Sequence, residues 1–268
     1  MSADSSAVRP LPFVLVDDDG GFSVNQEACA VLERVKTRLI VVAVAGLYRT
    51  GKSFLLNMLV KGVSGSRQEH PGFAVGGTVN ACTKGIWMWG EPIPLDDDTS
   101  VLFLDTEGLG SVDREQTHDT RIFALALLLA SNFSRLIDGN AIEDLSLVVN
   151  LSKHIQTSSS SKDAAGNADR LHEFFPSFMW VYLESALKPT GGLQRRRSRE
   201  GPDPSTLSDF FRHRDCVTLV RPVDDEQKLR NLPQVPYEEL RGEFRTSFES
   251  LQKRLFGKAK PKSMFGSH

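Results

Sequence analysis

The fold follows from one octapeptide, Gly46-Leu-Tyr-Arg-Thr-Gly-Lys-Ser53. It satisfies the pattern G-x-x-x-x-G-K-[ST], whose glycines let successive backbone N–H groups turn toward a phosphate. The pattern is informative only between a strand and a helix. Leu39–Ala45, before it, is an apolar run without alternation, as in a central parallel strand, and Lys52–Val60, after it, has leucines at helical spacing. The order strand, loop, helix therefore predicts a phosphate-binding loop.

The residues of this loop have separate expected roles. Lys52 is expected to reach the β- and γ-phosphates, and Ser53 to ligate Mg²⁺ through its hydroxyl. A glycine-rich turn without a ligand is the plain alternative, but the four fixed positions would arise by chance in only about one chain in a hundred of this length. The expected nucleotide contacts in this segment are Gly46, Leu47, Tyr48, Arg49, Thr50, Gly51, Lys52, Ser53 and Phe54.

A second motif follows the next apolar run, Val101–Leu104. Parallel sheets present ligand-binding groups at the carboxyl ends of their strands. Asp105-x-x-Gly108 at that position predicts a sensor, in which Asp105 holds the metal through water and the Gly108 N–H faces the γ-phosphate. The D-x-x-G pattern alone is weak, and a strand-ending turn is the alternative. The position of Asp105-x-x-Gly108 on the next apolar run after the phosphate loop strengthens the interpretation as a sensor.

The remaining segments predict an α/β fold of the P-loop NTPase type, with a mostly parallel sheet flanked by helices. Further strands are expected at Met179–Leu183 and Val217–Val220, and helices at Thr120–Ile137, Ala141–Ile155 and Phe244–Phe256. We expect one large domain over residues 1–268, with surface loops near 157–170 and 187–205 and a short basic tail at 257–268.

Composition limits the possible partners. The 32 Lys and Arg against 34 Asp and Glu give a formal charge of −2, which argues against a general nucleic-acid surface. The run Arg195–Arg197 lacks interleaved aromatic residues and is expected to be a solvated loop. The three cysteines suggest neither a disulfide framework nor zinc, and the longest apolar run, Ile122–Ala130, is far short of the about 20 residues of a spanning helix. We expect a cytoplasmic protein, with peripheral membrane contact only through partners.

Three stretches in order carry a family resemblance: the octapeptide, Cys82-Thr-Lys-Gly-Ile-Trp-Met-Trp89 and Leu104-Asp-Thr-Glu-Gly-Leu-Gly110. Together they resemble the guanylate-binding protein and atlastin branch of the dynamin-like large GTPases. The resemblance extends over Pro12–Phe256 and implies a dynamin-like GTPase domain. Its substrate would be GTP, its product GDP and its metal Mg²⁺.

The resemblance also implies further site residues. Thr83 would be the switch-one threonine that closes over Mg²⁺ and the γ-phosphate, Arg49 an internal arginine finger, and Glu107 the switch-two acid that orders the attacking water. A solvated loop arginine and a surface carboxylate are the alternatives for Arg49 and Glu107. The expected catalytic residues are thus Arg49, Lys52, Thr83 and Glu107, and the expected metal ligands are Ser53, Thr83 and Asp105.

The chain departs from the family at the base-reading motif. The family has T-L-R-D where this chain has Val181-Tyr-Leu-Glu184. Glu184 is able to accept both guanine hydrogen bonds, whereas Leu183 replaces an arginine without its charge or donors. Ala81 stands where the family has a serine. We expect Glu184 to contact the base, with a weakened guanine preference and slow turnover. Arg214-Asp215 precedes its strand and is rejected as the base reader.

Three functions remain open. The first is a Mg²⁺-dependent GTPase that forms a homodimer through its nucleotide-binding face, as relatives do. The second is a nucleotide-binding interaction or scaffold module with weak or no hydrolysis, suggested by Ala81, Leu183 and Glu184. The third is an adenine-nucleotide enzyme such as a small-molecule kinase, which keeps the phosphate loop and ignores the switch motifs.

Overall fold

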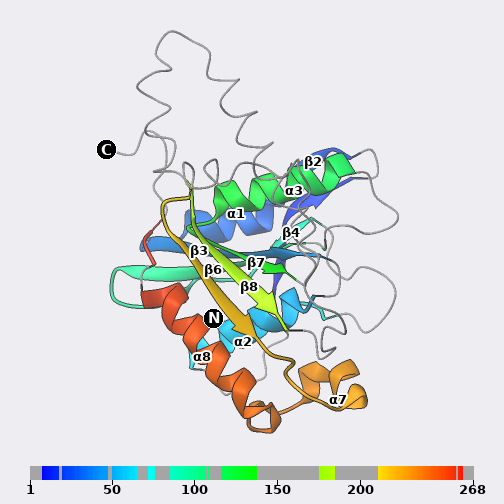
Figure 1. Ribbon diagram of the computed structural model, residues 1–268. Coiled ribbons are helices and arrows are strands. Elements are labelled where there is room, and N and C mark those ends of the chain that lie inside the picture. Colours follow the sequence, from blue (N-terminus) through cyan, green and yellow to red (C-terminus); the bar gives the residue numbers. More distant parts are fainter. Residues whose placement is uncertain are drawn as a thin grey trace, which may run out of the picture.

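A nine-stranded mixed sheet forms the middle layer of the molecule, with α1 and α3 on one side and α2 and α8 on the other (Figure 1). The computed structural model describes residues 8–17, 20–47, 50–65, 72–75, 85–106, 108, 116–137, 175–184, 211–257 and 259–261. The strand order is β2-β1-β4-β6-β3-β7-β8-β9, with β5 paired to β6.

The strands are β1 (Leu11–Val16), β2 (Phe22–Val24), β3 (Arg38–Gly46), β4 (Ile86–Met88), β5 (Ile93–Pro94), β6 (Thr99–Thr106), β7 (Asn132–Ile137), β8 (Ser177–Leu183) and β9 (Arg214–Leu219). The described helices are α1 (Gln26–Glu33), α2 (Lys52–Ser64), α3 (Gln116–Leu129), α7 (Glu226–Arg230) and α8 (Gly242–Gly257), with short 3₁₀ turns η2 (Leu232–Gln234) and η3 (Tyr237–Glu239).

Five adjacent strands, β6, β3, β7, β8 and β9, are parallel, and β1, β2, β4 and β5 add antiparallel pairs at the β6 side. The prediction of a mostly parallel, helix-flanked sheet is confirmed, and the fold is that of a P-loop NTPase. The expected strands around the octapeptide and the Asp105 motif are β3 and β6, which are hydrogen-bonded neighbours. Their carboxyl ends therefore meet at one edge of the sheet.

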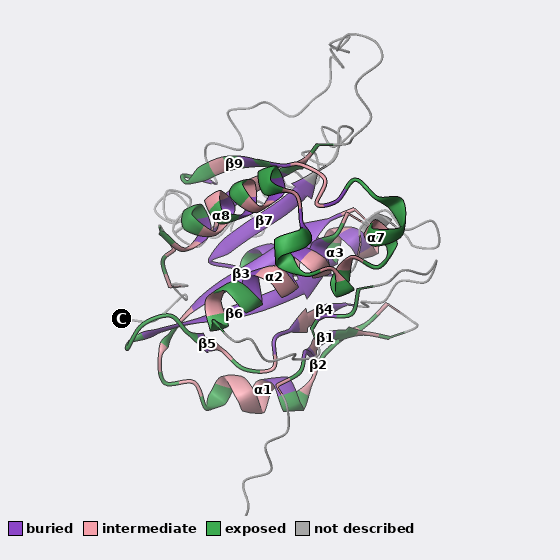
Figure 2. Ribbon diagram, turned by 90° about the horizontal axis from the view of Figure 1, so that it is seen from below, coloured by how far each residue is buried: buried purple, intermediate pink, exposed green. Residues whose placement is uncertain are grey.

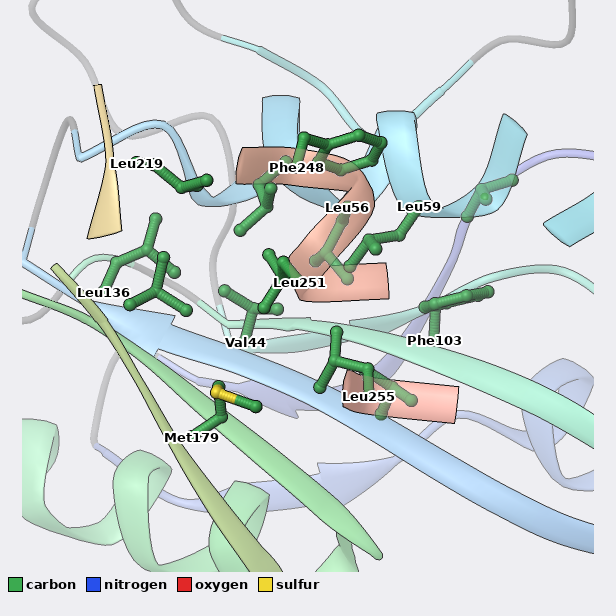
Figure 3. Packing of buried hydrophobic residues seen from close by; sticks show 14 of the residues in the cluster. Val44, Leu56, Leu59, Phe103, Leu136, Met179, Leu219, Phe248, Leu251 and Leu255 are labelled. Carbon is green, nitrogen blue, oxygen red and sulfur yellow. The ribbon is translucent and has the colours of Figure 1, made fainter. Parts of the chain in front are cut away.

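The central strands of the sheet are buried (Figure 2), because apolar side chains pack between the sheet and the helices on each side. On the α2 and α8 side, strand residues such as Val44, Leu136 and Met179 pack against Leu56 of α2 and Leu251 of α8 (Figure 3). On the other side, α3 covers a second apolar cluster. Burial on both faces explains why β3 reads as a continuous apolar run.

One sequence prediction is wrong. The helix expected over Thr120–Ile137 ends at Leu129, and Asn132–Ile137 forms the central parallel strand β7. Ser131 makes the change of direction, because its N–H donates to Val41 O at 2.8 Å and its Oγ accepts from Val41 N–H at 3.1 Å. Long-range pairing with β3 thus overrides the apolar pattern that continued the helix.

The amino-terminal elements and β4, β5 and β7 were not predicted. Asn25 gave a readable signal for α1, since its side chain accepts from the N–H groups of Glu27 and Ala28 as an N-cap. Pro12 lies within β1, whose register shifts between Pro12 and Val14, and proline is tolerated at such irregularities. The helix predicted for Ala141–Ile155 and the loops near 157–170 and 187–205 lie outside the described residues.

The closing helix predicted for Phe244–Phe256 is confirmed as α8. Its buried residues Phe244, Phe248, Leu251 and Leu255 recur at helical spacing and face the sheet. The strands predicted at Met179–Leu183 and Val217–Val220 are confirmed as β8 and β9, although β9 begins earlier, at Arg214.

Candidate nucleotide site

The phosphate-loop glycines occupy positions that other residues would not fit. A Cβ on Gly46, the last residue of β3, would lie 2.7 Å from the Leu136 carbonyl oxygen of β7. Gly51, the N-cap of α2, has φ 84°, a left-handed conformation that glycine adopts without strain. The chain therefore lies close against β7 where β3 ends, and α2 begins directly after Gly51. The first N–H groups of α2, which have no partner within the helix, are thus next to the loop.

Two side chains converge on one carbonyl inside this loop. Lys52, only 6% exposed, donates from Nζ to Leu47 O at 3.0 Å, and the Thr50 hydroxyl donates to the same oxygen at 2.9 Å. The lysine ammonium is thus folded back over the loop instead of extending into solvent. The Thr50 contact was not predictable, because its position in the pattern accepts any residue.

The second predicted motif meets the loop directly. Ser53 Oγ donates to Asp105 Oδ2 at 2.6 Å, and Asp105 is fully buried. Register places Asp105 beside Val44, and the adjacent Thr106 hydroxyl donates to Val44 O at 3.0 Å, which fixes the end of β6 against β3. Two of the three residues predicted to hold a metal are therefore in contact.

The pair formed by Ser53 and Asp105 has the chemistry that Mg²⁺ requires. A hydroxyl and a carboxylate are hard oxygen ligands, and Mg²⁺ in phosphate sites uses one or two such groups together with water and substrate oxygens. Within the ranges that the structure describes, no group of three or more His, Cys, Asp or Glu side chains is arranged to hold a metal ion. The residues present therefore fit a magnesium site in which the protein supplies few ligands, and water and substrate oxygens supply the others.

Glu184 lies at the same edge of the sheet, two strands from the loop. It follows β8 directly, its N–H donates to Leu219 O at 2.9 Å, and its side chain is exposed. Leu136 pairs with Gly46 on one side and with Val181 on the other, so the end of β8 lies level with the start of the loop. Ligands of parallel α/β sheets bind at this edge, outside the carboxyl ends of the strands.

The structure also describes other residues considered for base or nucleotide contacts. Leu183 packs against the apolar cluster beneath α2 and α8. Asp215, in the dipeptide rejected as base reader, is at the amino end of β9 and forms an ion pair with Arg254 at 2.6 Å. The Phe54 ring packs on Phe244, with ring centroids 6.5 Å apart, so a nucleotide contact by Phe54 would have to come from its backbone.

Four predicted site residues, Tyr48, Arg49, Thr83 and Glu107, lie outside the described residues. Gly108 is described and half-buried beyond the end of β6. The structure brings Ser53 and Asp105 into contact beside Lys52, which precedes Ser53 in the chain, and places Glu184 on the same edge. Among the helices it describes, none combines the length and apolar character needed to cross a membrane.

Comparisons with known proteins give one consistent family. A family profile described as "Guanylate-binding protein, N-terminal domain" matches residues 19–182. Guanylate-binding protein 4 of Homo sapiens is 33% identical over 97% of this chain and 44% of its own length, and guanylate-binding protein 7 of Mus musculus is 33% identical over 94% and 43%. The chain thus spans less than half the length of these curated relatives.

A solved structure of translation elongation factor SelB from Methanococcus maripaludis, in complex with the GTP analogue GppNHp, aligns with 87% of this chain and 37% of its own at 11% identity. Its TM-score of 0.39 is too low to bear on fold or function. The profile, by contrast, covers more than half of the sequence and includes the phosphate loop, Asp105 and β8 as far as Tyr182. On that match, the chain belongs to the guanylate-binding protein family and corresponds to its amino-terminal domain.

Proposed function

We propose that this chain binds GTP and, with Mg²⁺, slowly hydrolyses it to GDP. The 2.6 Å hydrogen bond between Ser53 and Asp105 carries the proposal, because it joins two expected metal ligands that are 52 positions apart in sequence. It does so beside a buried lysine, at the edge where a parallel sheet binds its ligands. A glycine-rich turn without a ligand does not require a hydroxyl, a buried carboxylate and a buried lysine at one place, whereas a phosphate and metal site does.

The proposed roles follow from charge and position. The Lys52 ammonium and the loop N–H groups bind phosphate oxygens, and burial strengthens their attraction because the local dielectric is low. Ser53 and Asp105, with Thr83, hold Mg²⁺, which when bound supplies positive charge against the phosphates. Arg49 stabilises charge on the transferring phosphoryl group and Glu107 orders the attacking water, the roles that the family implies.

Glu184 is proposed to read the base. A carboxylate accepts from both the N1–H and the exocyclic amine of guanine, a pair of donors that adenine lacks on the same edge. Glutamate has one methylene more than the family aspartate, so its carboxylate projects further from β8. We therefore propose a preference for guanine that is weaker than the family motif would provide.

The test is to measure binding and hydrolysis of GTP, GDP and ATP by the wild type beside single variants. Lys52→Ala should abolish tight binding, whereas Arg49→Ala should keep binding and lower kcat by about 10³-fold. Glu184→Ala should reduce the preference for GTP over ATP about tenfold or more, the discrimination typical of a lost bidentate base contact. Glu33→Ala, an exposed glutamate of α1, is the matched control and should change neither.

Each alternative has a distinct result in the same assay. Unchanged turnover in Arg49→Ala would remove the arginine finger from the mechanism. Tight GTP binding by the wild type with negligible turnover would select the interaction or scaffold module, and a preference for ATP would select the adenine-nucleotide enzyme. An intact guanine preference in Glu184→Ala would assign base reading to another residue.

We further propose that residues 1–268 form one GTPase domain, that it acts in the cytoplasm, and that it forms a homodimer through the nucleotide-binding face when GTP is bound. The support for the dimer is the family resemblance, in which pairing accompanies the GTP state. Light scattering with GDP, a non-hydrolysable GTP analogue and a transition-state mimic tests it. A monomer in every nucleotide state would reject dimerisation without affecting the hydrolysis proposal.

A further inference from the structure

The two end strands of the described sheet differ in length. In the strand order, β2 and β9 each have a hydrogen-bonded neighbour on one side only, and β9 forms one edge of the sheet (Figure 2). β2 has three residues, whereas β9 has six. An edge strand presents unpaired N–H and C=O groups to which a strand of another chain can bind, and a very short edge strand limits this. The length of β9 gives no such protection.

Two hydrogen bonds show which backbone groups of β9 face outward. Phe178 N–H donates to His213 O at 2.8 Å, and Glu184 N–H donates to Leu219 O at 2.9 Å. In a parallel pair of strands, every second residue directs its backbone groups to the same neighbour. The odd-numbered residues of β9 therefore face β8. The residues with outward backbone groups are all exposed: Arg214, Cys216 and Thr218.

A side chain of β9 itself occupies the central outward N–H. Asp215 Oδ1 accepts from Cys216 N–H at 2.8 Å, and the same oxygen accepts from Arg254 Nη1 of α8 at 2.6 Å. Val217 and Leu219 are buried in the apolar cluster that includes α8. Asp215 alternates with them along the strand, so it lies on the α8 face of the sheet. Its carboxylate thus binds the donor that a strand added to β9 would bind through a carbonyl oxygen.

The outward groups of β9 are complementary to those of a second copy. Two copies related by a two-fold axis would place their β9 strands antiparallel. With the axis at Cys216, Arg214 of each copy is opposite Thr218 of the other, so all three outward residues are paired. The two Cys216 residues would exchange both backbone hydrogen bonds, with their Cα atoms about 5.5 Å apart. This register needs the two Cys216 N–H groups that the Asp215 carboxylates occupy.

We propose that the outer edge of β9 is a self-pairing surface that Asp215 keeps closed. The partner is a second copy of this chain, because the two-fold register pairs every outward residue of β9. Asp215 removes the central donor from each copy, and Arg254 holds the carboxylate in place. The inference is independent of the proposed GTPase function, whose homodimer forms through the nucleotide-binding face when GTP is bound.

The test compares Asp215→Ala with Asp96→Ala in the full chain without nucleotide. Asp96 is a matched control, because its Oδ1 also accepts from a backbone N–H, that of Asp98 at 2.9 Å, in the hairpin between β5 and β6. Cross-linking by a short bis-maleimide measures the paired fraction through the exposed Cys216 thiol. Asp215→Ala should cross-link about 10- to 100-fold faster than the wild type, the effect of two regained backbone hydrogen bonds. Asp96→Ala should match the wild type.

Three further variants identify the pairing surface. Cys216→Ser, added to Asp215→Ala, should abolish the faster cross-linking. Thr218→Pro removes an outward N–H without breaking a bond to β8, and proline is tolerated at such positions of an edge strand. Added to Asp215→Ala, it should restore the wild-type rate. Asp215→Asn keeps an acceptor for Cys216 N–H and should stay within about threefold of the wild type.

Three results would overturn the proposal. The first is an Asp215→Ala rate equal to that of Asp96→Ala, which would show that the edge does not pair when the carboxylate is absent. The second is fast cross-linking that persists with Thr218→Pro, because association would then not use the backbone of β9. The third is equally fast cross-linking in Asp215→Asn and Asp215→Ala, because the hydrogen bond to Cys216 would then not be what closes the edge.

Discussion

The Ser53 hydroxyl donates a 2.6 Å hydrogen bond to the buried carboxylate of Asp105. This bond connects the first turn of α2 with the end of β6, two elements that are packed against the same core. A charged carboxylate in the interior is stabilised by the donors around it, and a hydrogen bond to a charged group contributes more than a neutral one. The pair therefore combines a structural role with the proposed metal site.

Ser53→Ala should remove the dependence of GTP affinity on Mg²⁺ and lower the stability of the nucleotide-free chain by about 1–3 kcal/mol, because Asp105 loses a donor. Titrations of a fluorescent GTP analogue with and without Mg²⁺, together with chemical denaturation, measure the two effects. Ser64→Ala, at the exposed end of the same helix, is the control. A retained magnesium dependence in Ser53→Ala would contradict the assignment of Ser53 as a ligand.

Gly46→Ala should destabilise the fold by about 1–3 kcal/mol, since the added methyl group would meet the Leu136 carbonyl at 2.7 Å and the backbones of β3 and β7 would have to separate. Thermal denaturation measures the loss. At Gly257, the last residue of α8, an added Cβ meets nothing within 4 Å. Gly257→Ala should therefore leave the melting temperature unchanged or raise it, and equal effects of the two substitutions would contradict the packing argument.

Ser134 and Ser131 provide a matched pair of buried hydroxyls. Among the residues that the structure describes, Ser134 Oγ on β7 has no hydrogen-bond partner, whereas Ser131 Oγ accepts from Val41 N–H. Ser134→Ala should be neutral or stabilise the protein by up to about 1 kcal/mol, while Ser131→Ala should destabilise it by about 1–2 kcal/mol because a buried N–H loses its acceptor. Urea denaturation of both variants measures the two changes in stability. A larger loss of stability in Ser134→Ala than in Ser131→Ala would show that the Ser134 hydroxyl makes the stronger hydrogen bonds.

We expect the protein to lose stability at high pH because of Tyr237. Burial raises the pKa of its phenol above the ordinary 10.0, and the nearby Glu249 carboxylate, 3.4 Å from the hydroxyl, raises it further. Above pH 10 the unfolded chain releases this proton more readily than the folded chain, so the free energy of unfolding falls as pH rises toward and through the folded-state pKa. Below that range the contribution is fully present.

Tyr237→Phe should remove this part of the pH dependence. Denaturant unfolding measured at steps between about pH 8 and 11 should give a shallower decline for the variant than for the wild type. Parallel curves for the two proteins would show that Tyr237 does not titrate differently on folding.

The parts of the fold that were predictable are those with strong local patterns. The apolar run ending at Gly46, the leucine spacing of α2 and the spacing of Phe244, Phe248 and Leu251 in α8 each identify an element without reference to the rest of the chain. β7 was misassigned to a helix because Arg135, a charged residue at a strand position, is itself buried and packs over the Phe123 ring at 5.0 Å. Neither strand alternation nor a continuous apolar run was visible there.

The sequence by itself determined the phosphate loop, because glycine torsions, a lysine and a helix start are encoded within eight consecutive residues. It also determined the family, through motifs that keep their order along the chain. Only the tertiary structure decided which residues meet. It brings Ser53 to Asp105 and the Asn57 side chain to the Phe73 backbone, and it places the end of β8 level with the start of the phosphate loop. These depend on the register of parallel strands and on packing between elements far apart in sequence, which no local pattern records.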